Sequence, residues 1–114
     1  MPMKDDKILI THGSGGKQTR YLIENILLKY FKDPALKFLP DAANLGFKKI
    51  SDNICFTTDS YVVKPIFFPG GDIGKLSICG TINDLAVSGA TPFFISCAFI
   101  IEEGFKIAHF EKIL

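Results

Sequence analysis

The chain has little of what marks membrane proteins or nucleic-acid-binding proteins. Its longest apolar run, PFFISCAFII, is about half of what a membrane-spanning helix needs. Its 13 basic and 12 acidic residues are interspersed and give a net charge of +1, so no basic surface for nucleic acid or an anionic membrane is indicated. The N-terminal MPMKDDK lacks the apolar core of a signal peptide. We therefore expect a cytoplasmic protein that binds neither nucleic acid nor membrane.

Cysteine is also scarce. Cys55, Cys79 and Cys97 are odd in number, widely spaced and never arranged as CxxC, so neither a zinc site nor a disulfide framework is indicated. We interpret them as small hydrophobic residues of the core. The chain contains no repeat, low-complexity tract or linker, and 114 residues are enough for one domain at most, with a modest core.

Apolar residues, by contrast, are abundant. They make up 47% of the chain, and the mean hydropathy of +0.26 is high for a small monomer. This composition predicts that another chain or domain covers some apolar surface. The segments YVVKPIFF and FFISCAFII are too hydrophobic for two open sheet edges, so we expect a homodimer with paired sheets.

Local patterns predict three helices. Over residues 73–88 apolar side chains recur at helical spacing, with Asp72 as N-cap and Gly89 in the left-handed position after the last turn. A second helix over 17–32 carries an apolar stripe and is expected to pack on a sheet. A third helix begins at about Lys106 and runs to the last residue without a capping signal, so we expect the chain to be part of something longer.

Short segments between these helices have the composition of strands. NICFTTD alternates two kinds of side chain, FFISCAFII fits a strand buried on both faces, and YVVKPIFF carries a proline that suggests a bend or an edge position. Strands are thus expected at residues 7–10, 36–40, 53–59, 61–68 and 93–101. The mixed order of strands and helices favours an α/β (α+β) fold.

The segment HGSGGK opens the second helix and is a candidate phosphate-binding loop. Backbone N–H groups of such a loop can surround an anion, and the helix N-terminus adds partial positive charge. The alternative is a flexible loop without a ligand. GxxxxGK[ST] and GxGxxG are both excluded, because Gln18 stands where the first motif needs Ser or Thr and the second needs Gly.

Three aspartates in apolar or small-residue surroundings form a candidate metal site: Asp41, Asp59 and Asp84. Such carboxylates are commonly found around Mg²⁺, which takes oxygen ligands and bridges nucleotide phosphates. Asp84 is the most unusual of them, because it lies in the middle of a helix. A buried Asp84 needs a partner or a cation, since burial of an isolated carboxylate is costly. A solvated charge on the polar face is the alternative for Asp84, and caps or surface charges are the alternative for the whole set.

Taken together, these motifs resemble a known family. HGSGGK, DAA, FTTDSYVVKPIFFPGGDIGKLSICGTINDLAVSGATP and ISCAFIIEEGF are similar to the N-terminal half of the HypE family, the carbamoyl dehydratases of hydrogenase maturation. The resemblance covers residues 8 to about 114 and extends to a superfamily with aminoimidazole ribonucleotide synthetase, selenophosphate synthetase and thiamine-monophosphate kinase. It implies that residues 1–114 are an N-terminal ATP-binding and dimerisation domain, whose four-stranded mixed sheet pairs with that of a second subunit into an eight-stranded barrel.

The resemblance also implies roles for individual residues. ATP and Mg²⁺ are expected near the dimer interface, with the metal on Asp41, Asp59 and Asp84. The nucleotide is expected to contact Asp59, Asn83 and the mobile loop of Gly13, Ser14, Gly15 and Gly16. One departure is Pro40, which replaces an acidic residue or glycine often found before the aspartate of DAA. It leaves the geometry of that loop open.

The activity implied is ATP-dependent dehydration of a carbamoylated C-terminal cysteine to a thiocyanate, the source of the hydrogenase cyanide ligands. Partners implied are the carbamoyl-transferring and iron-scaffold proteins of hydrogenase maturation. The C-terminal half that carries the reacting cysteine is absent, so this chain alone is expected to be inactive. Two alternatives stay open: another synthetase or small-molecule kinase of the superfamily, although HGSGGK lacks the cysteine of selenophosphate synthetase, and a non-catalytic dimerisation or partner-binding module.

Overall fold

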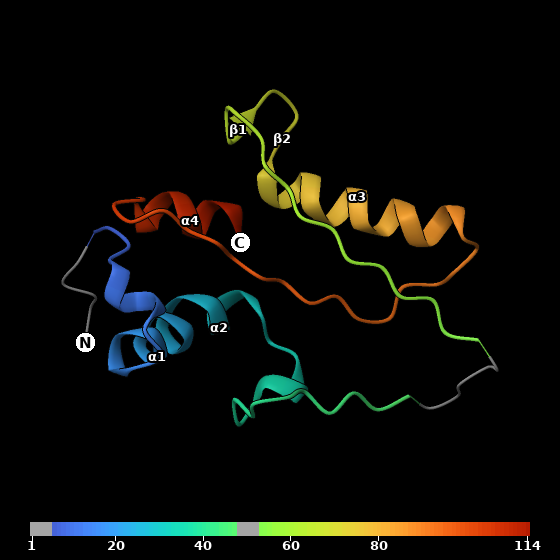
Figure 1. Ribbon diagram of the computed structural model, residues 1–114, viewed down its shortest axis with the longest axis horizontal. Helices are drawn as coiled ribbons and strands as arrows, with labels where there is room; N and C mark the ends of the chain where they lie inside the picture. Colours follow the sequence, from blue (N-terminus) through green and yellow to red (C-terminus); the bar gives the residue numbers. More distant parts are fainter. Residues whose placement is uncertain (1–5, 48–52) are drawn as a thin grey trace. The chain divides into compact units, whose positions relative to one another are not determined.

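The computed structural model describes residues 6–47 and 53–114 of the chain (Figure 1). They divide into two compact units, which we treat separately. Unit 1 comprises residues 6–47 and 100–112 together with Leu114, and unit 2 comprises residues 53–99 together with Ile113. None of the helices in these ranges has the length and hydropathy that a membrane crossing requires.

Unit 1 contains one long helical segment, as the sequence predicts. It is built from α1 (Lys17–Leu22), a π-helical turn η2 (Ile23–Leu27) and α2 (Leu28–Tyr30). The segment ends two residues before the predicted boundary, because Phe31 adopts an extended conformation with φ −93° and ψ 96°. A 3₁₀ turn, η1 (Ile10–Gly13), precedes it.

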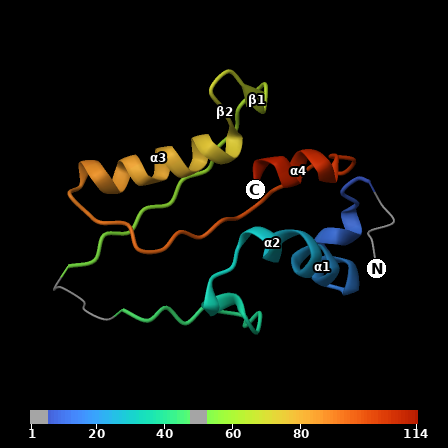
Figure 2. The same ribbon diagram turned by 180° about the vertical axis from the view of Figure 1, so that it is seen from behind.

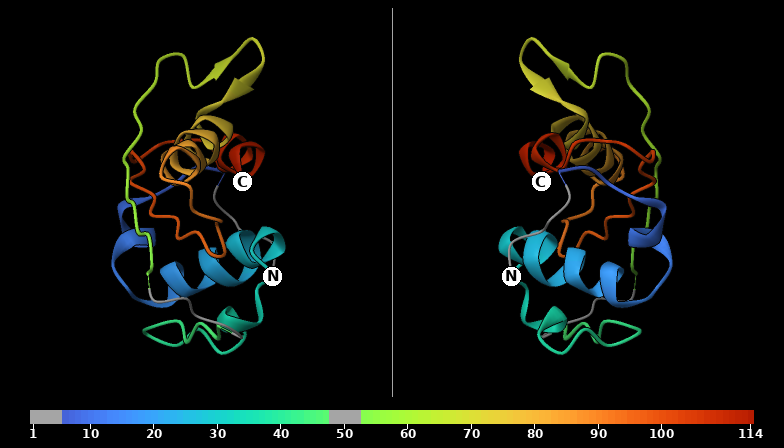
Figure 3. Two further views of the ribbon diagram at one scale, coloured as in Figure 1. Left: turned by 90° about the vertical axis from the view of Figure 1, so that its right-hand side faces the viewer. Right: turned by 90° about the vertical axis from the view of Figure 1, so that its left-hand side faces the viewer.

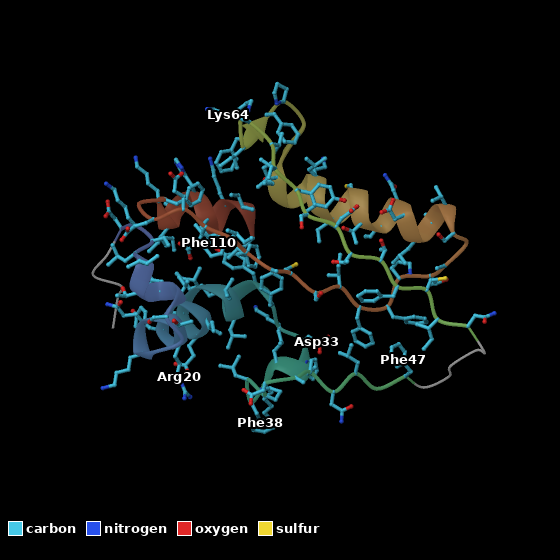
Figure 4. The ribbon with its side chains drawn as sticks, viewed as in Figure 1. Arg20, Asp33, Phe38, Phe47, Lys64 and Phe110 are labelled. Carbon is cyan, nitrogen blue, oxygen red and sulfur yellow. The ribbon has the colours of Figure 1, made fainter. Side chains whose placement is uncertain are left out.

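The core of unit 1 lies between this helical segment and α4 (Ile107–Ile113). Phe110, which is 3% exposed, is its most buried side chain (Figure 4). The expectation that the second helix packs on a sheet is wrong, because its apolar stripe is covered by α4 instead. The third predicted helix, starting at Lys106, is confirmed. The buried residues of this core are Ile8, Leu22, Ile26, Ile107 and Phe110.

The strand predicted at residues 7–10 is reduced to a single antiparallel bridge between Lys7 and Lys106. Beside it the Ile8 N–H donates to the Phe105 carbonyl at 2.8 Å. The chain then turns into η1 at Ile10, so no ladder extends further. This bridge nevertheless holds the first described residues of unit 1 against its last segment.

The strand predicted at residues 36–40 is wrong. Asp33 accepts a hydrogen bond from the Ala35 N–H at 2.8 Å and caps the 3₁₀ turn η3 (Pro34–Leu36). Leu39 follows in a left-handed conformation with φ 46°. A cap followed by proline at the first helical position starts a helical turn, and this local signal outweighs the apolar composition of LKFLP.

Unit 2 contains a small antiparallel hairpin and a long helix. The strands β1 (Phe67–Phe68) and β2 (Gly71–Asp72) pair Phe67 with Asp72 and lead directly into α3 (Ile73–Val87). The hairpin stands at the N-terminal end of α3 (Figure 2), and Figure 3 shows it in a view close to the helix axis. In the ranges that the structure describes, this is the one sheet, so the sheet is smaller than the predicted four strands.

The segments 53–59 and 93–101 are extended chain and form no strand, and within unit 2 residues 53–59 and 93–99 run beside α3 (Figure 1). A strand exists only where a neighbour supplies ladder hydrogen bonds, and within the described residues no such neighbour is assigned to them. Their apolar composition is that of strands, whereas the pairing that would make strands of them is not formed among the described residues.

The ends of α3 agree with the sequence prediction. Asp72 caps its start by accepting a hydrogen bond from the Lys75 N–H at 2.9 Å. Its last turn closes as a Schellman motif: Gly89, with φ 73°, donates to Ala86 at 3.0 Å, and Ala90 donates to Leu85 at 2.9 Å. Asp84 therefore lies on the last full turns of a well-capped helix.

Candidate functional site

A groove of about 380 Å³ lies in unit 2 between α3 and the two extended segments. One wall is formed by residues 55–59, a second by residues 92–96, and α3 contributes Ile78, Thr81, Ile82 and Leu85. The lining combines aromatic and aliphatic side chains with hydroxyl groups and one carboxylate. This mixture of apolar walls and few polar groups is typical of small-molecule sites.

Asp59 supplies the carboxylate of this groove. Its Oδ2 atom accepts a hydrogen bond from the Tyr61 hydroxyl at 3.1 Å. The side chain is exposed, and its Oδ1 atom has no partner within the part of the chain that the structure describes. One oxygen of Asp59 is thus oriented by the protein, and the other is open to a ligand.

Asn83 and Asp84 lie on α3 next to groove residues Ile82 and Leu85, but their own side chains do not line the groove. Both are exposed. The Asp84 carbonyl accepts the Ser88 hydroxyl at 2.9 Å. An exposed carboxylate avoids the desolvation cost of burial, so Asp84 needs no partner inside this chain.

Asp41, the remaining candidate ligand, is an exposed residue of unit 1. In the described ranges no group of three or more His, Cys, Asp or Glu side chains is placed to hold a metal ion. A Mg²⁺ shared by the three aspartates therefore remains a prediction.

The glycine-rich loop Gly13–Gly16 is exposed on unit 1. Two local bonds hold it: the Gly15 N–H donates to Thr19 Oγ1 at 2.9 Å, and Ser14 Oγ donates to the Thr11 carbonyl at 2.8 Å. Gly15 has a φ of 79°, which favours glycine, and a Cβ there would meet nothing within 4 Å. The loop therefore faces open space.

The start of this loop is fixed by two side chains that sequence reasoning missed. His12 is 5% exposed, and its Nδ1 accepts the Leu9 N–H at 2.9 Å. Glu103 Oε1 accepts the Ile10 N–H at 3.2 Å. The contact of His12 is local, three residues from Leu9, whereas no spacing rule connects Ile10 with Glu103, which are 93 positions apart.

The cysteines differ from the prediction: Cys55, Cys79 and Cys97 are free and exposed, not core residues. All three belong to unit 2, in which no described residue is buried, so there is no core for them to join. Partial desolvation raises the pKa of the Cys97 thiol, which makes it a weaker nucleophile than an ordinary cysteine at neutral pH.

The donor set of the groove fits a nucleotide with a hard cation. Carboxylate and hydroxyl oxygens are the ligands that Mg²⁺ takes, and Asp59, Thr57 and Thr58 supply them on one wall. Phe56 and Phe93 add aromatic surface against which a planar base could pack. Asp59 would bear the cation, and the threonines would donate to phosphate oxygens.

Comparison with known families is consistent with this chemistry. A family model described as AIR synthase related protein, N-terminal domain, matches residues 40–114. The chain belongs to this family. The matched part contains both the groove and the whole of α3.

Relatives of this AIR synthase related domain include two bacterial enzymes. A carbamoyl dehydratase HypE of Rhodobacter capsulatus is 44% identical over 114 residues, which is 100% of this chain and 34% of that protein. The HypE of Escherichia coli K12 is 45% identical over 112 residues, or 96% of this chain and 33% of that protein. The chain thus spans about a third of the length of the curated relatives it matches.

Among solved structures, the AIR synthase related domain is similar to a hydrogenase maturation protein HypE crystallised in complex with ATP. The TM-score is 0.85 at 45% identity, over 92% of this chain and 30% of that one. The α/β fold of the family is therefore shown for this chain.

Proposed function

We propose that this chain is the N-terminal ATP-binding and dimerisation domain of a HypE-type carbamoyl dehydratase. The similarity to the ATP-bound HypE structure, at 45% identity and a TM-score of 0.85, carries the proposal. The groove on unit 2 supports it independently, because its lining fits a nucleotide. A cytoplasmic location is kept as the expectation from the sequence.

In the complete protein, ATP would supply a γ-phosphoryl group to the carbamoyl oxygen of an S-carboxamide cysteine. Departure of phosphate with that oxygen, and loss of both N–H protons, would leave a thiocyanate. The residues of this chain bind and orient in that scheme: Asp59 holds the cation side of the nucleotide, and the Gly13–Gly16 loop offers backbone N–H groups. The reacting cysteine is not expected among Cys55, Cys79 and Cys97.

We extend the proposal to Mg²⁺ and to the partners. A Mg²⁺ on Asp41, Asp59 and Asp84, with Asn83 as a polar contact, would neutralise the triphosphate and orient its γ-phosphate. The protein would exchange its cysteine-bound group with a carbamoyl-transferring protein and an iron-scaffold protein of hydrogenase maturation.

A homodimer is part of the proposal and has physical support in unit 2. Val62 is 97% exposed and Ile54 70% exposed, and both lie on extended chain that forms no strand in the described structure. Pairing of these segments with a second copy would bury apolar surface and complete the eight-stranded barrel.

The decisive experiment is direct binding of Mg·ATP to the protein expressed from its complete gene, with the Asp84→Asn variant beside the wild type. The variant keeps the shape of the side chain and removes a charged ligand. We expect affinity to fall about tenfold or more, which is about 1.4 kcal/mol, as measured by calorimetry.

The same variant separates a ligand from a structural residue. Without nucleotide its melting temperature should be unchanged or higher, since Asp84 is exposed and makes no ion pair with the described residues, and in the proposed site removing its charge would relieve repulsion among the carboxylates. A large loss of stability without ligand, combined with unchanged Mg·ATP affinity, would make Asp84 structural and the site assignment wrong.

A further inference from the structure

Asp59 is held by a side chain that no motif in the sequence singles out. The Tyr61 hydroxyl donates to Asp59 Oδ2 at 3.1 Å across a single intervening residue. Asp59 is itself exposed, so burial does not restrict its rotamers. The hydrogen bond from Tyr61 is the contact with the described residues that selects one orientation of this carboxylate at the groove.

The Tyr61 ring in turn packs against α3 at Gly80. A Cβ on Gly80 would stand 2.8 Å from the Tyr61 Cζ and 2.9 Å from its Cε1, and it would also collide with the hydroxyl oxygen. Contacts under 3 Å at a Cβ are not found in folded proteins, so the ring can lie here only because residue 80 has no side chain. Gly80 lies within α3, where glycine is less favourable for the helix than alanine.

This arrangement forms a chain of three residues that ends in the groove. Gly80 gives room for the ring, the ring fixes the position of its hydroxyl, and the hydroxyl fixes Asp59. Thr81, the next residue on α3, lines the same groove as Asp59, so the position at which Tyr61 contacts Gly80 is adjacent to the groove wall.

We propose that Tyr61 and Gly80 are positioning residues for the nucleotide–cation site, which they serve by presenting the free Oδ1 of Asp59 to the ligand. The inference rests on the proposed function, because it assigns Asp59 to Mg·ATP. Preorganisation is the physical benefit: a carboxylate that is already oriented loses less rotamer freedom when it binds the cation. Neither residue need touch the ligand.

The first test removes the hydroxyl and keeps the ring. We expect Tyr61→Phe in the full-length protein to bind Mg·ATP about three- to tenfold more weakly, the range for loss of one hydrogen bond. Tyr30→Phe is the matched control, since Tyr30 is a tyrosine of unit 1 that is 45% exposed, and its affinity should equal that of the wild type. Unchanged affinity in Tyr61→Phe overturns the proposal.

The second test separates positioning from simple support of the fold. Gly80→Ala displaces the ring and should weaken Mg·ATP binding to a similar extent. If both residues act through Asp59, the double variant Tyr61→Phe/Gly80→Ala should have about the same affinity as whichever single variant binds less tightly. Fully additive losses would overturn the proposal. Thermal melting behaves differently: Gly80→Ala should raise the melting temperature more in Tyr61→Ala, where no ring remains to collide, than in the wild type or in Tyr61→Phe.

A ligand-free signal completes the design. The ¹³C resonance of the Asp59 carboxyl carbon should shift in Tyr61→Phe and stay in place in Tyr30→Phe. If the wild type binds no Mg·ATP, the proposed function fails, and the site for which we infer the positioning fails with it. If the wild type binds Mg·ATP and the Asp59 resonance does not shift in Tyr61→Phe, only the positioning inference is overturned.

Discussion

The two units of the chain handle their apolar residues in opposite ways. Unit 1 buries Ile8, Leu22, Ile26, Ile107 and Phe110 against one another. Unit 2 has no buried residue in its described range, although it contains Val62 at 97% and Phe56 at 87% exposure. Helix α3, which is apolar overall, also has no buried residue.

This contrast indicates where each unit obtains its stability. Unit 1 has a small core made by its own chain, whereas the ordered parts of unit 2 depend on local bonds such as the Asp72 cap and the Schellman turn at Gly89. Burial of apolar surface stabilises a folded protein by about 25 cal/mol per Å². The apolar side chains that unit 2 leaves in water do not contribute this free energy. Unit 2 is thus the part of the chain that association would stabilise most.

The largest expected effect concerns the assembly of unit 2. Val62→Asp combined with Ile54→Asp removes two exposed apolar side chains from the proposed dimer surface and places charges there. The two side chains together contribute about 3–6 kcal/mol, so the dimer should dissociate at least about a hundredfold more readily. Sedimentation velocity at micromolar concentration should then show a monomer.

Phe38→Asp is the control for this experiment, because Phe38 is 85% exposed and belongs to unit 1, not to the proposed surface of unit 2 (Figure 4). This variant should stay dimeric. A wild-type protein that sediments as a clean monomer would refute the dimer and leave the apolar surface of unit 2 without its proposed partner.

The core of unit 1 gives the next largest effect. Phe110→Ala should lower the free energy of unfolding by about 3–5 kcal/mol, because it leaves a cavity among buried side chains. Phe38→Ala should cost less than about 1 kcal/mol, since that ring is exposed beside Lys37. Urea unfolding of both variants measures the difference, and equal losses would contradict the assignment of Phe110 to the core of unit 1.

The cap of α3 gives a smaller effect in unit 2. Asp72→Ala removes the acceptor of the Lys75 N–H and should cost about 1 kcal/mol of helix stability. Asp72→Asn should be close to neutral, because asparagine caps equally well. Hydrogen exchange of the first-turn amides of α3 reports the change, and faster exchange in Asp72→Asn than in Asp72→Ala would argue against the cap.

The smallest effect is electrostatic and belongs to unit 1. The Glu111 carboxylate accepts a hydrogen bond from Lys29 Nζ at 3.0 Å and raises the pKa of that lysine above its usual 10.5. Because the pKa is higher in the folded state than in the unfolded state, the ion pair adds to the free energy of unfolding at neutral pH. This contribution is lost as pH rises through the folded pKa. Glu111→Gln should return the Lys29 pKa toward 10.5, as followed by NMR of the side-chain nitrogen. An unchanged titration would mean that the ion pair does not form in solution.

Parts of this structure governed by local chemistry could be predicted from the sequence. Asp72 identifies the start of α3, because its side chain accepts a backbone N–H of the first turn. Gly89 identifies the end, because it has a positive φ after the last turn. The apolar stripe of α4 was predicted for the same reason: residues at helical spacing share one face.

What the sequence could not provide is pairing between distant segments. FFISCAFII has the composition of a strand, but composition does not supply the neighbour that makes one. The three cysteines were expected in a core that unit 2 does not build by itself. Gly80 offered a signal that went unused, because a glycine inside a helical pattern often has a packing reason, which here is the ring of Tyr61.

The bridge between Lys7 and Lys106 also has a consequence for how the protein is made on the ribosome. Ile8 is translated almost a hundred residues before its core partners Ile107 and Phe110. At about 5–20 residues per second, that delay is on the order of 5–20 seconds, during which α1 displays its apolar stripe without a cover. The nascent chain therefore has a window in which a chaperone can recognise unit 1, and that window closes when α4 leaves the exit tunnel.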